Sequence, residues 1–342
     1  MIDRLVWIGT ENTYPYRNLA MEEYMTTHVP EGTCILFLWQ NRHTVVIGKN
    51  QNCWRECRVN CLEEEGGYLV RRLSGGGAVF HDLGNLNFTF IVRKKDYDVD
   101  RQLQVILEAV RLLGIQAQKT GRNDITVNGR KFSGNAFYRS GDYCYHHGTL
   151  LIRADKETMS RYLNVSKEKL ASKGVASVKS RVANLCEFCP DLTVEQMKAA
   201  LVEAFSHVYG RTAVKMEETE LPEETIRTLT KRFESWQWKY GRKIPFEYEM
   251  ERRFSWGGIQ MQFHVNEGRI QEAAVFSDAM DQEMIGELEE RLRGCRYEEK
   301  AMCELVCRQR EEELSEMTVE TDTDFIRRQM KQDIAELIKE SL

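Results

Sequence analysis

The stretch Arg71-Arg72-Leu73-Ser74-Gly75-Gly76-Gly77-Ala78-Val79-Phe80-His81-Asp82 carries the most structural information in this sequence. Three consecutive glycines separate two apolar, strand-like runs. A triple glycine weakens a strand, so it marks a place where the backbone approaches another group closely. Successive N–H groups in such a turn bind anions, and adjacent arginines supply the forked donors that phosphate and carboxylate prefer. The stretch therefore predicts an anion-binding turn rather than a plain hairpin tip.

The residues after this stretch alternate in polarity, as a strand with one packed face does. The apolar positions are Leu86, Phe88, Phe90 and Val92, and the polar positions between them are Asn85, Asn87 and Thr89. The two asparagines are therefore expected on one face of a sheet, with the apolar side chains packed on the other.

Two later strands show the same kind of polar face. One face of the strand over 131–138 is expected to carry Lys131, Ser133 and Asn135. Its other face is expected to carry Phe132, Ala136 and Tyr138. In the strand over 143–153, His147 and Thr149 lie two residues apart and point to the same side.

The remaining pattern predicts antiparallel strands with helices inserted late, which is an α+β arrangement. The apolar runs 34–39 and 44–47 are expected to form a hairpin of buried strands. Further predicted strands are 5–8, 124–127, 246–256, 259–266 and 269–276. Predicted helices are one ending before Pro30, one after residue 51 that carries spaced cysteines, and 100–113, 155–172, 193–209, 223–237 and the region from 281.

Length and composition describe a globular protein of two domains. The chain has 342 residues, of which 42% are hydrophobic and 30% charged. A boundary near Pro245 divides it into a catalytic domain, 1–245, and an accessory domain, 246–342. The net charge of −5 argues against a nucleic-acid partner. No leader or membrane-length apolar run is apparent, so a cytoplasmic, monomeric protein is expected.

The ten cysteines are interpreted as small packed hydrophobes. Cys186 and Cys189 have the spacing of half a zinc site, but no second pair lies at a suitable distance. A zinc site formed by His81, His146 and His147 is disfavoured, because adjacent strand residues face opposite ways.

Four stretches, in order along the chain, resemble the lipoate–protein ligases, which share a larger group with biotin–protein ligases and octanoyltransferases. They are the glycine stretch 72–85, the pair of segments 121–125 and 129–136, the segment 145–151, and the segment 173–185. The resemblance implies a mixed, antiparallel-rich sheet with helices, similar to biotin ligases and class II synthetases, followed by a small α+β accessory domain. It also implies that lipoate is activated with ATP to lipoyl-AMP, from which the lipoyl group passes to a lysine of an acceptor protein.

Lys131 is the best candidate for catalysis. It is an isolated lysine on a polar strand face, where it could reach the acyl carboxylate and the α-phosphate together. Asn123 and Asp124 form a compact pair of oxygen donors, and Asp124 is the candidate ligand for a Mg²⁺ ion that bridges phosphates. ATP and Mg²⁺ are expected as co-substrate and ion, with no tightly bound cofactor.

The resemblance assigns the other site residues to two groups. The ATP and lipoyl-AMP group comprises Arg72, Ser74, Gly75, Gly76, Gly77, Ala78, Val79, Phe80, Asn85, Asn87, Asn123, Asp124, Lys131, Lys173 and Lys179. The lipoate group comprises Arg72, His81, Lys131, Gly134, His147, Gly148 and Thr149.

By the same resemblance, the acceptors are lipoyl domains of 2-oxoacid dehydrogenase complexes and the glycine-cleavage carrier protein, with no nucleic acid or membrane partner. The alternative is an octanoyl- or lipoyltransferase that works without ATP through a cysteine thioester. Cys144, close to His146 and His147 in the sequence, is then the candidate nucleophile.

Overall fold

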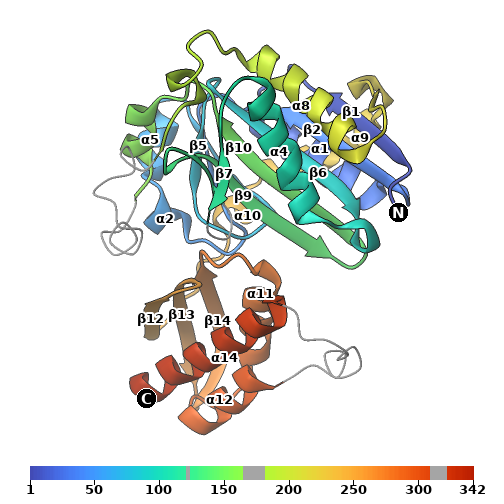
Figure 1. Ribbon diagram of the computed structural model, residues 1–342. Coiled ribbons are helices and arrows are strands. Elements are labelled where there is room, and N and C mark those ends of the chain that lie inside the picture. The colour runs from blue at the N-terminus through green and yellow to red at the C-terminus, as the bar shows by residue number, and fades with distance from the viewer. Residues whose placement is uncertain (121–123, 165–181, 309–321) are drawn as a thin grey trace. The chain divides into compact units, whose positions relative to one another are not determined.

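An eight-stranded mixed sheet forms the centre of the first of two compact units in the computed structural model (Figure 1). The structure describes residues 1–120, 124–164, 182–308 and 322–342. From one edge to the other, the strands are β11 (Val214–Lys215), β1 (Arg4–Gly9), β2 (Thr33–Trp39), β6 (Asn85–Arg93), β10 (Tyr143–Leu151), β9 (Arg130–Ser140), β8 (Asp124–Val127) and β7 (Gln118–Thr120). The pairs of β1 with β2 and β11 are parallel, and the other neighbours are antiparallel.

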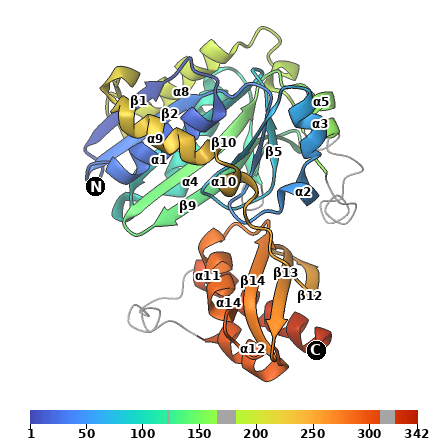
Figure 2. The same ribbon diagram turned by 180° about the vertical axis from the view of Figure 1, so that it is seen from behind.

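Helices cover both faces of this sheet. On one face lie α4 (Val99–Leu112) and α8 (Val194–Tyr209), and on the other lie α1 (Pro15–His28) and α9 (Glu223–Glu234) (Figure 2). The Asp98 carboxylate caps α4 by accepting from the Arg101 N–H, and Thr193 with Gln196 forms a capping box on α8.

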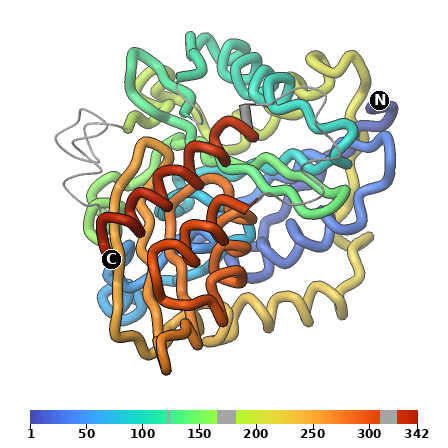
Figure 3. Tube along the Cα trace, turned by 90° about the horizontal axis from the view of Figure 1, so that it is seen from below, coloured from blue at the N-terminus to red at the C-terminus, as the bar shows by residue number. Residues whose placement is uncertain are grey.

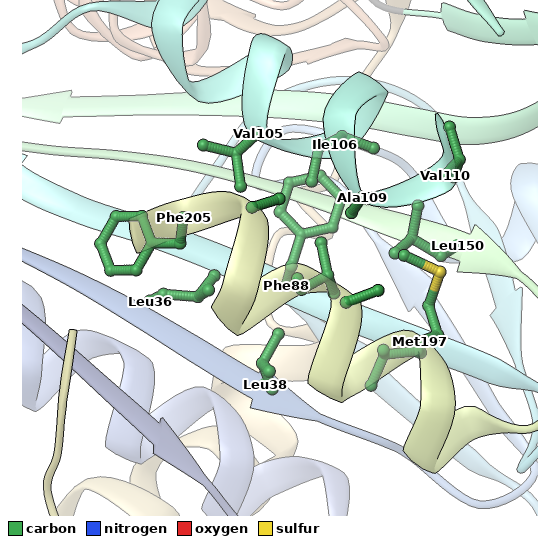
Figure 4. Packing of buried hydrophobic residues seen from close by; sticks show 14 of the residues in the cluster. Leu36, Leu38, Phe88, Val105, Ile106, Ala109, Val110, Leu150, Met197 and Phe205 are labelled. Atoms are coloured by element: carbon green, nitrogen blue, oxygen red, sulfur yellow. The ribbon is translucent and has the colours of Figure 1, made fainter. Parts of the chain in front are cut away.

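The core under α4 and α8 confirms the predicted alternation in β6. Leu86, Phe88, Phe90 and Val92 all lie in this core, together with apolar side chains of both helices (Figure 4). Asn85, Asn87 and Thr89 point to the α1 face, where Thr89 bonds to side chains of β2 and α1. Polar side chains on that face are thus built into the sheet beside α1.

The predicted hairpin of 34–39 and 44–47 is wrong. β2 pairs within the large sheet, whereas β3 (Thr44–Ile47) joins β4 (Tyr68–Arg71) and β5 (Val79–His81) in a separate sheet of three strands. Both runs are apolar throughout, so periodicity shows that each strand is buried but does not identify its partner. The predicted cysteine helix is two short helices, α2 (Cys53–Glu56) and α3 (Val59–Glu64).

Two short helices and three one-turn 3₁₀ helices are the remaining elements among the described residues of the first unit. The helices are α5 (Lys156–Tyr162) and α10 (Trp236–Tyr240), the latter ending at the first residue of the next unit. One-turn 3₁₀ helices lie at Lys94–Asp96, Leu185–Glu187 and Glu218–Glu220.

The second unit is a three-stranded antiparallel sheet, β12 (Tyr248–Phe254), β13 (Gly257–Asn266) and β14 (Arg269–Ser277), with helices on one face. The helices are α11 (Gln282–Leu292), α12 (Glu299–Cys307) and α14 (Asp322–Ser341), and α14 runs beside α12 (Figure 3). This unit comprises Tyr240–Leu342 and two short segments from earlier in the chain, Gly48–Asn52 and Ser74–Gly77. The expected domain boundary between residues 245 and 246 stays a prediction.

The α+β class with a large mixed sheet and a smaller α+β unit is confirmed. Within the described parts of the chain, every helix is too short or too polar to cross a membrane.

Candidate active site

A β-bulge in β9 determines which way Lys131 points. Ile125 pairs with Ser133 and Thr126 pairs with Lys131, so Phe132 is the extra residue on its strand. Phe132 is buried in the core under α4 and α8. Lys131 instead lies on the α1 face together with Gly134, because a Cβ atom on Gly134 would be 2.7 Å from the Lys131 Nζ.

The expectation that Lys131, Ser133 and Asn135 share a face is therefore wrong. The Asn135 side chain bonds to His146 on the opposite face, 2.8 Å from Oδ1 to Nε2. Ser133 lies two residues before Asn135, and no bulge separates them. Both side chains are therefore on the same face. Strict alternation fails here because the bulge inserts one residue, which the sequence pattern does not reveal.

Lys131 forms an ion pair with Asp124 on the neighbouring strand. The Nζ lies 2.6 Å from the Asp124 Oδ1, with side chains 21% and 16% exposed. Asp124 stands directly opposite Gly134 in the register. The Lys131 carbonyl accepts from the Ala183 N–H at 2.8 Å, which fixes the backbone of β9 at this residue. The ammonium is thus held in place but remains partly accessible.

The polar face continues from β9 onto β10. The Thr149 Oγ1 accepts from the Gly134 N–H at 3.3 Å, and His147 lies two residues away on the same face, as predicted. Gly148 faces the other way, where a Cβ would be 2.6 Å from the Phe88 ring. Gly148 therefore permits close packing behind the polar face.

A buried network fixes His147, and the sequence alone did not identify its other members. The Glu22 Oε1 lies 2.8 Å from the His147 Nδ1 and accepts from the Thr89 Oγ1 at 2.7 Å. The Trp39 Nε1 donates to the same Thr89 oxygen at 3.1 Å. Glu22 lies three residues from both Leu19 and Met25, so it is an acid inside the apolar stripe of α1, and that signal could have identified it.

Arg72 and His81 lie in the interior of the first unit. The Arg72 Nη1 donates to the Val46 carbonyl at 3.3 Å. Burial lowers the pKa of the Arg72 guanidinium to about 10, and the Tyr145 and Glu22 side chains partly oppose that shift. Burial, and then the positive charge of Arg72, lower the pKa of His81 to about 3. A cationic arginine and a neutral histidine therefore lie together near Glu22.

Buried polar atoms accompany these two side chains. Asn85 donates from Nδ2 to the Asn87 Oδ1 at 2.9 Å. The Asn41 Nδ2 lies 3.2 Å from the His81 Nδ1. Within the described parts of the chain, the Asn85 Oδ1, the Asn87 Nδ2 and the His81 Nε2 have no hydrogen-bond partner. Because a buried polar atom without a partner is costly, these atoms favour a polar ligand or ordered water.

The glycine stretch itself is divided between the two units. Ser74, Gly75, Gly76 and Gly77 belong to the second unit, whereas Arg72 and Ala78, Val79 and Phe80 belong to the first. Gly76 has a φ of 86°, and its N–H donates to the Ala279 carbonyl at 2.9 Å. A Cβ on Gly75 would be 2.5 Å from that same oxygen. The predicted close approach is real, and one of its partners is the backbone after β14.

Three predicted residues, Asn123, Lys173 and Lys179, lie outside the described residues. Among the residues that are described, no group of three or more His, Cys, Asp or Glu side chains is arranged to hold a metal ion. Asp124 offers a single carboxylate, which is sufficient for Mg²⁺ only where substrate phosphates and waters supply the other ligands.

The buried histidines predict a pH dependence of stability. Burial lowers the pKa of His81 and of His146 from 6.5 to about 3. Below pH 6.5 the unfolded chain therefore binds more protons than the folded protein, so stability falls as the pH drops toward 3. Each histidine should lower the free energy of unfolding by about 1.4 kcal/mol between pH 7.5 and pH 5.5. In urea titrations, His146→Gln should reduce this pH difference by about that amount, and an unchanged difference would contradict the assignment.

Two family models match this chain. Residues 14–206 match the lipoyl protein ligase A/B catalytic domain, and residues 243–338 match the bacterial lipoate protein ligase C-terminus.

Solved structures of similar proteins agree with these models. P. falciparum LipL1 in complex with lipoate is 28% identical with a TM-score of 0.79, over 96% of this chain and 99% of that chain. A bi-partite lipoate protein ligase from Thermoplasma acidophilum, which forms an archaeal lipoylation system with its E2 lipoyl domain, is 27% identical with a TM-score of 0.63, over 71% of this chain and 98% of that chain. A lipoate-protein ligase A bound with ATP is 26% identical with a TM-score of 0.61, over 70% and 99%. Since the catalytic-domain model spans more than half of the chain, the resemblance is confirmed and the protein belongs to the lipoate–protein ligase family.

Proposed function

We propose that the protein activates lipoate with ATP to lipoyl-AMP and transfers the lipoyl group to a lysine of an acceptor protein. The family supports lipoate attachment, and similar proteins were solved with lipoate, with lipoic acid and with ATP. The observation that carries the proposal is the Lys131–Asp124 pair at 2.6 Å beside Gly134, on the polar face that continues to His147.

In the first step, a lipoate carboxylate oxygen attacks the α-phosphorus of ATP, the bond to the β-phosphate breaks, and pyrophosphate leaves. Two anionic groups must approach each other, so the site needs fixed positive charge. We assign Lys131 to the carboxylate and the α-phosphate, since its Nζ is held by Asp124 yet remains partly accessible. The buried Arg72 guanidinium supplies a second fixed cation.

We assign the acyl chain to the part of the sheet beside Glu22. We assign the rings of His147, held at 2.8 Å by Glu22, and of Trp39 to contact with the apolar chain. Neutral His81, Asn85 and Asn87 offer uncharged polar atoms to the substrate in this part of the site. Mg²⁺ bound to Asp124 would neutralise phosphate charge.

In the second step, the neutral amine of the acceptor lysine attacks the carbonyl carbon of lipoyl-AMP, the amide forms, and AMP leaves. A lysine with a pKa near 10.4 must lose its proton first, so positioning contributes much of the rate. Lipoyl domains are the proposed acceptors, in keeping with the E2 lipoyl domain that belongs to the Thermoplasma acidophilum ligase system. The glycine-cleavage carrier protein, a cytoplasmic location and a monomeric state stay predictions.

The surroundings of Cys144 argue against the thioester alternative. Cys144 is fully buried in the core under α4 and α8, on the face opposite His147. Burial raises the pKa of its thiol to about 11, which disfavours the nucleophilic thiolate.

Cys144→Ser should therefore retain most of the ATP-dependent lipoylation of an acceptor domain, with a loss of stability of about 1 kcal/mol from the buried hydroxyl. The measurement is the rate of acceptor modification, followed by intact-protein mass spectrometry. Loss of activity together with an acyl adduct on Cys144 in the wild type would support the transferase.

An ATP–pyrophosphate exchange assay with lipoate, octanoate or biotin tests the proposal. Exchange is expected with lipoate and not with biotin. Absence of exchange with every acid, while acyl transfer proceeds without ATP, would overturn it.

A further inference from the structure

The second unit contains two loops from the first 80 residues of the chain. Gly48–Asn52 follows β3, and Ser74–Gly77 follows β4. Because β3 and β4 are parallel neighbours, both loops begin at the same end of the sheet, where the two strands end. Residues of the second unit then hold each loop by direct hydrogen bonds.

Arg242 fixes the first loop. Its Nη1 donates to the Asn50 Oδ1 at 2.7 Å and to the Lys49 carbonyl at 3.3 Å. Its Nη2 donates to the Val275 carbonyl at 2.8 Å and pairs with Glu289 at 2.6 Å. One guanidinium thus joins the loop to β14 and α11, in a planar geometry that a lysine cannot reproduce.

The first loop in turn fixes the glycine loop. The Lys49 N–H donates to the Ser74 carbonyl at 2.9 Å. A Cβ on Gly48 would be 2.3 Å from the Gly76 carbonyl oxygen, so the two backbones approach too closely for a side chain at Gly48.

Asp278 belongs to a second support of the glycine loop, in the turn that follows β14. Its Oδ1 accepts from the Gly258 N–H at 2.8 Å, and its Oδ2 lies 3.4 Å from the Arg253 guanidinium. These contacts hold the turn in which the Ala279 carbonyl accepts from the Gly76 N–H at 2.9 Å. The same contacts fix the Arg253–Gly258 segment against Asp278.

We propose that Arg242 and Asp278 are positioning residues for the ATP-dependent step, acting through Lys49 and Ala279 on the backbone of Ser74–Gly77. The inference rests on the proposed function and on the expectation from the sequence that Ser74, Gly75, Gly76 and Gly77 bind ATP. Loss of either support lets the loop backbone shift, and a shift of about 1 Å is enough to cost about 100-fold in a positioned reaction. The KM for ATP therefore changes more than the KM for lipoate.

The kinetic test compares Arg242→Met with Arg291→Met in lipoate-dependent pyrophosphate exchange. The two arginines are equally accessible, at 21% and 23%, and Arg291 pairs with Glu287 without touching either loop. Arg242→Met and Asp278→Asn should raise the KM for ATP by about tenfold with a lipoate KM within about twofold of wild type. Arg242→Lys should recover only part of the loss, and Arg291→Met should match wild type. Asn50→Ala, which removes a smaller contact, replaces Arg242→Met if that variant does not fold.

Hydrogen exchange tests the same supports without relying on activity. In wild type and Arg291→Met, the peptide containing Gly75–Gly77 should be protected, whereas Arg242→Met and Asp278→Asn should exchange about tenfold faster there. Unchanged protection, an unchanged KM for ATP, or a lowered one would overturn the inference. Wild-type protein with protected glycines but no pyrophosphate exchange would instead contradict the proposed function.

Discussion

Replacing Lys131 by alanine is expected to reduce lipoate-dependent ATP–pyrophosphate exchange by about 1,000-fold or more. The Lys131 ammonium is 2.6 Å from Asp124 and adjoins Gly134 on the polar face of the large sheet. Loss of one donor to a developing oxyanion costs about 100- to 1,000-fold, and Lys131 is assigned to two anionic groups. Incorporation of labelled pyrophosphate into ATP, as its β- and γ-phosphates, measures the first step directly.

Lys131→Arg should also be poor, because a planar guanidinium does not replace a compact ammonium at a shared contact. Lys198→Ala is the matched control, since Lys198 is 12% exposed and pairs with Glu195 on α8. Circular dichroism and thermal unfolding should be near wild type in all three variants. Turnover within about threefold of wild type in folded Lys131→Ala would contradict the assignment of Lys131.

Gly134→Ala is expected to lower the same exchange rate by about 100-fold without lowering stability. The new Cβ would lie 2.7 Å from the Lys131 Nζ and 2.8 Å from its Cε, so the end of the lysine must move. Moving a flexible side-chain end costs little stability, and alanine in place of glycine reduces the entropy of the unfolded chain. The ammonium is thereby displaced from its position beside Asp124, while the fold remains intact.

Gly286→Ala serves as the control for this substitution, because nothing lies within 4 Å of a Cβ at that position in α11. It should be as active as wild type and slightly more stable. Full activity in Gly134→Ala would show that the Lys131 ammonium has no fixed catalytic position. A loss of activity that parallels a loss of stability would show that Gly134 is only structural.

Local patterns in the sequence predicted much of the fold. The alternation in β6 placed Asn85 and Asn87 opposite the core correctly, because that strand pairs without a bulge. The same reasoning failed in β9, where the extra Phe132 returns Lys131 to the face of Gly134. A bulge depends on the partner strand, so residue polarity in one strand does not reveal it.

Contacts between segments far apart in the chain could not be predicted from local patterns. The strands β2 and β3 were recognised as buried, but their assignment to different sheets depends on β6, β4 and β5. Likewise, the glycine stretch was recognised as a close backbone approach, whereas its contact with Ala279 spans about 200 residues. Glu22 was missed because a glutamate in a helix is usually solvent-exposed, and its position among the apolar residues of α1 was not considered.

The central claim, that an acyl-adenylate on this enzyme is the donor to the acceptor lysine, is tested by a single-turnover transfer experiment. The enzyme is incubated with lipoate and α-labelled ATP, separated from free nucleotide by gel filtration, and mixed with a lipoyl domain without further ATP. We expect the label to elute with the enzyme as lipoyl-AMP and then to leave as AMP, in equal amount to the amide formed on one acceptor lysine. Transfer without any retained label, or retained lipoyl-AMP that does not modify the acceptor, would contradict the claim.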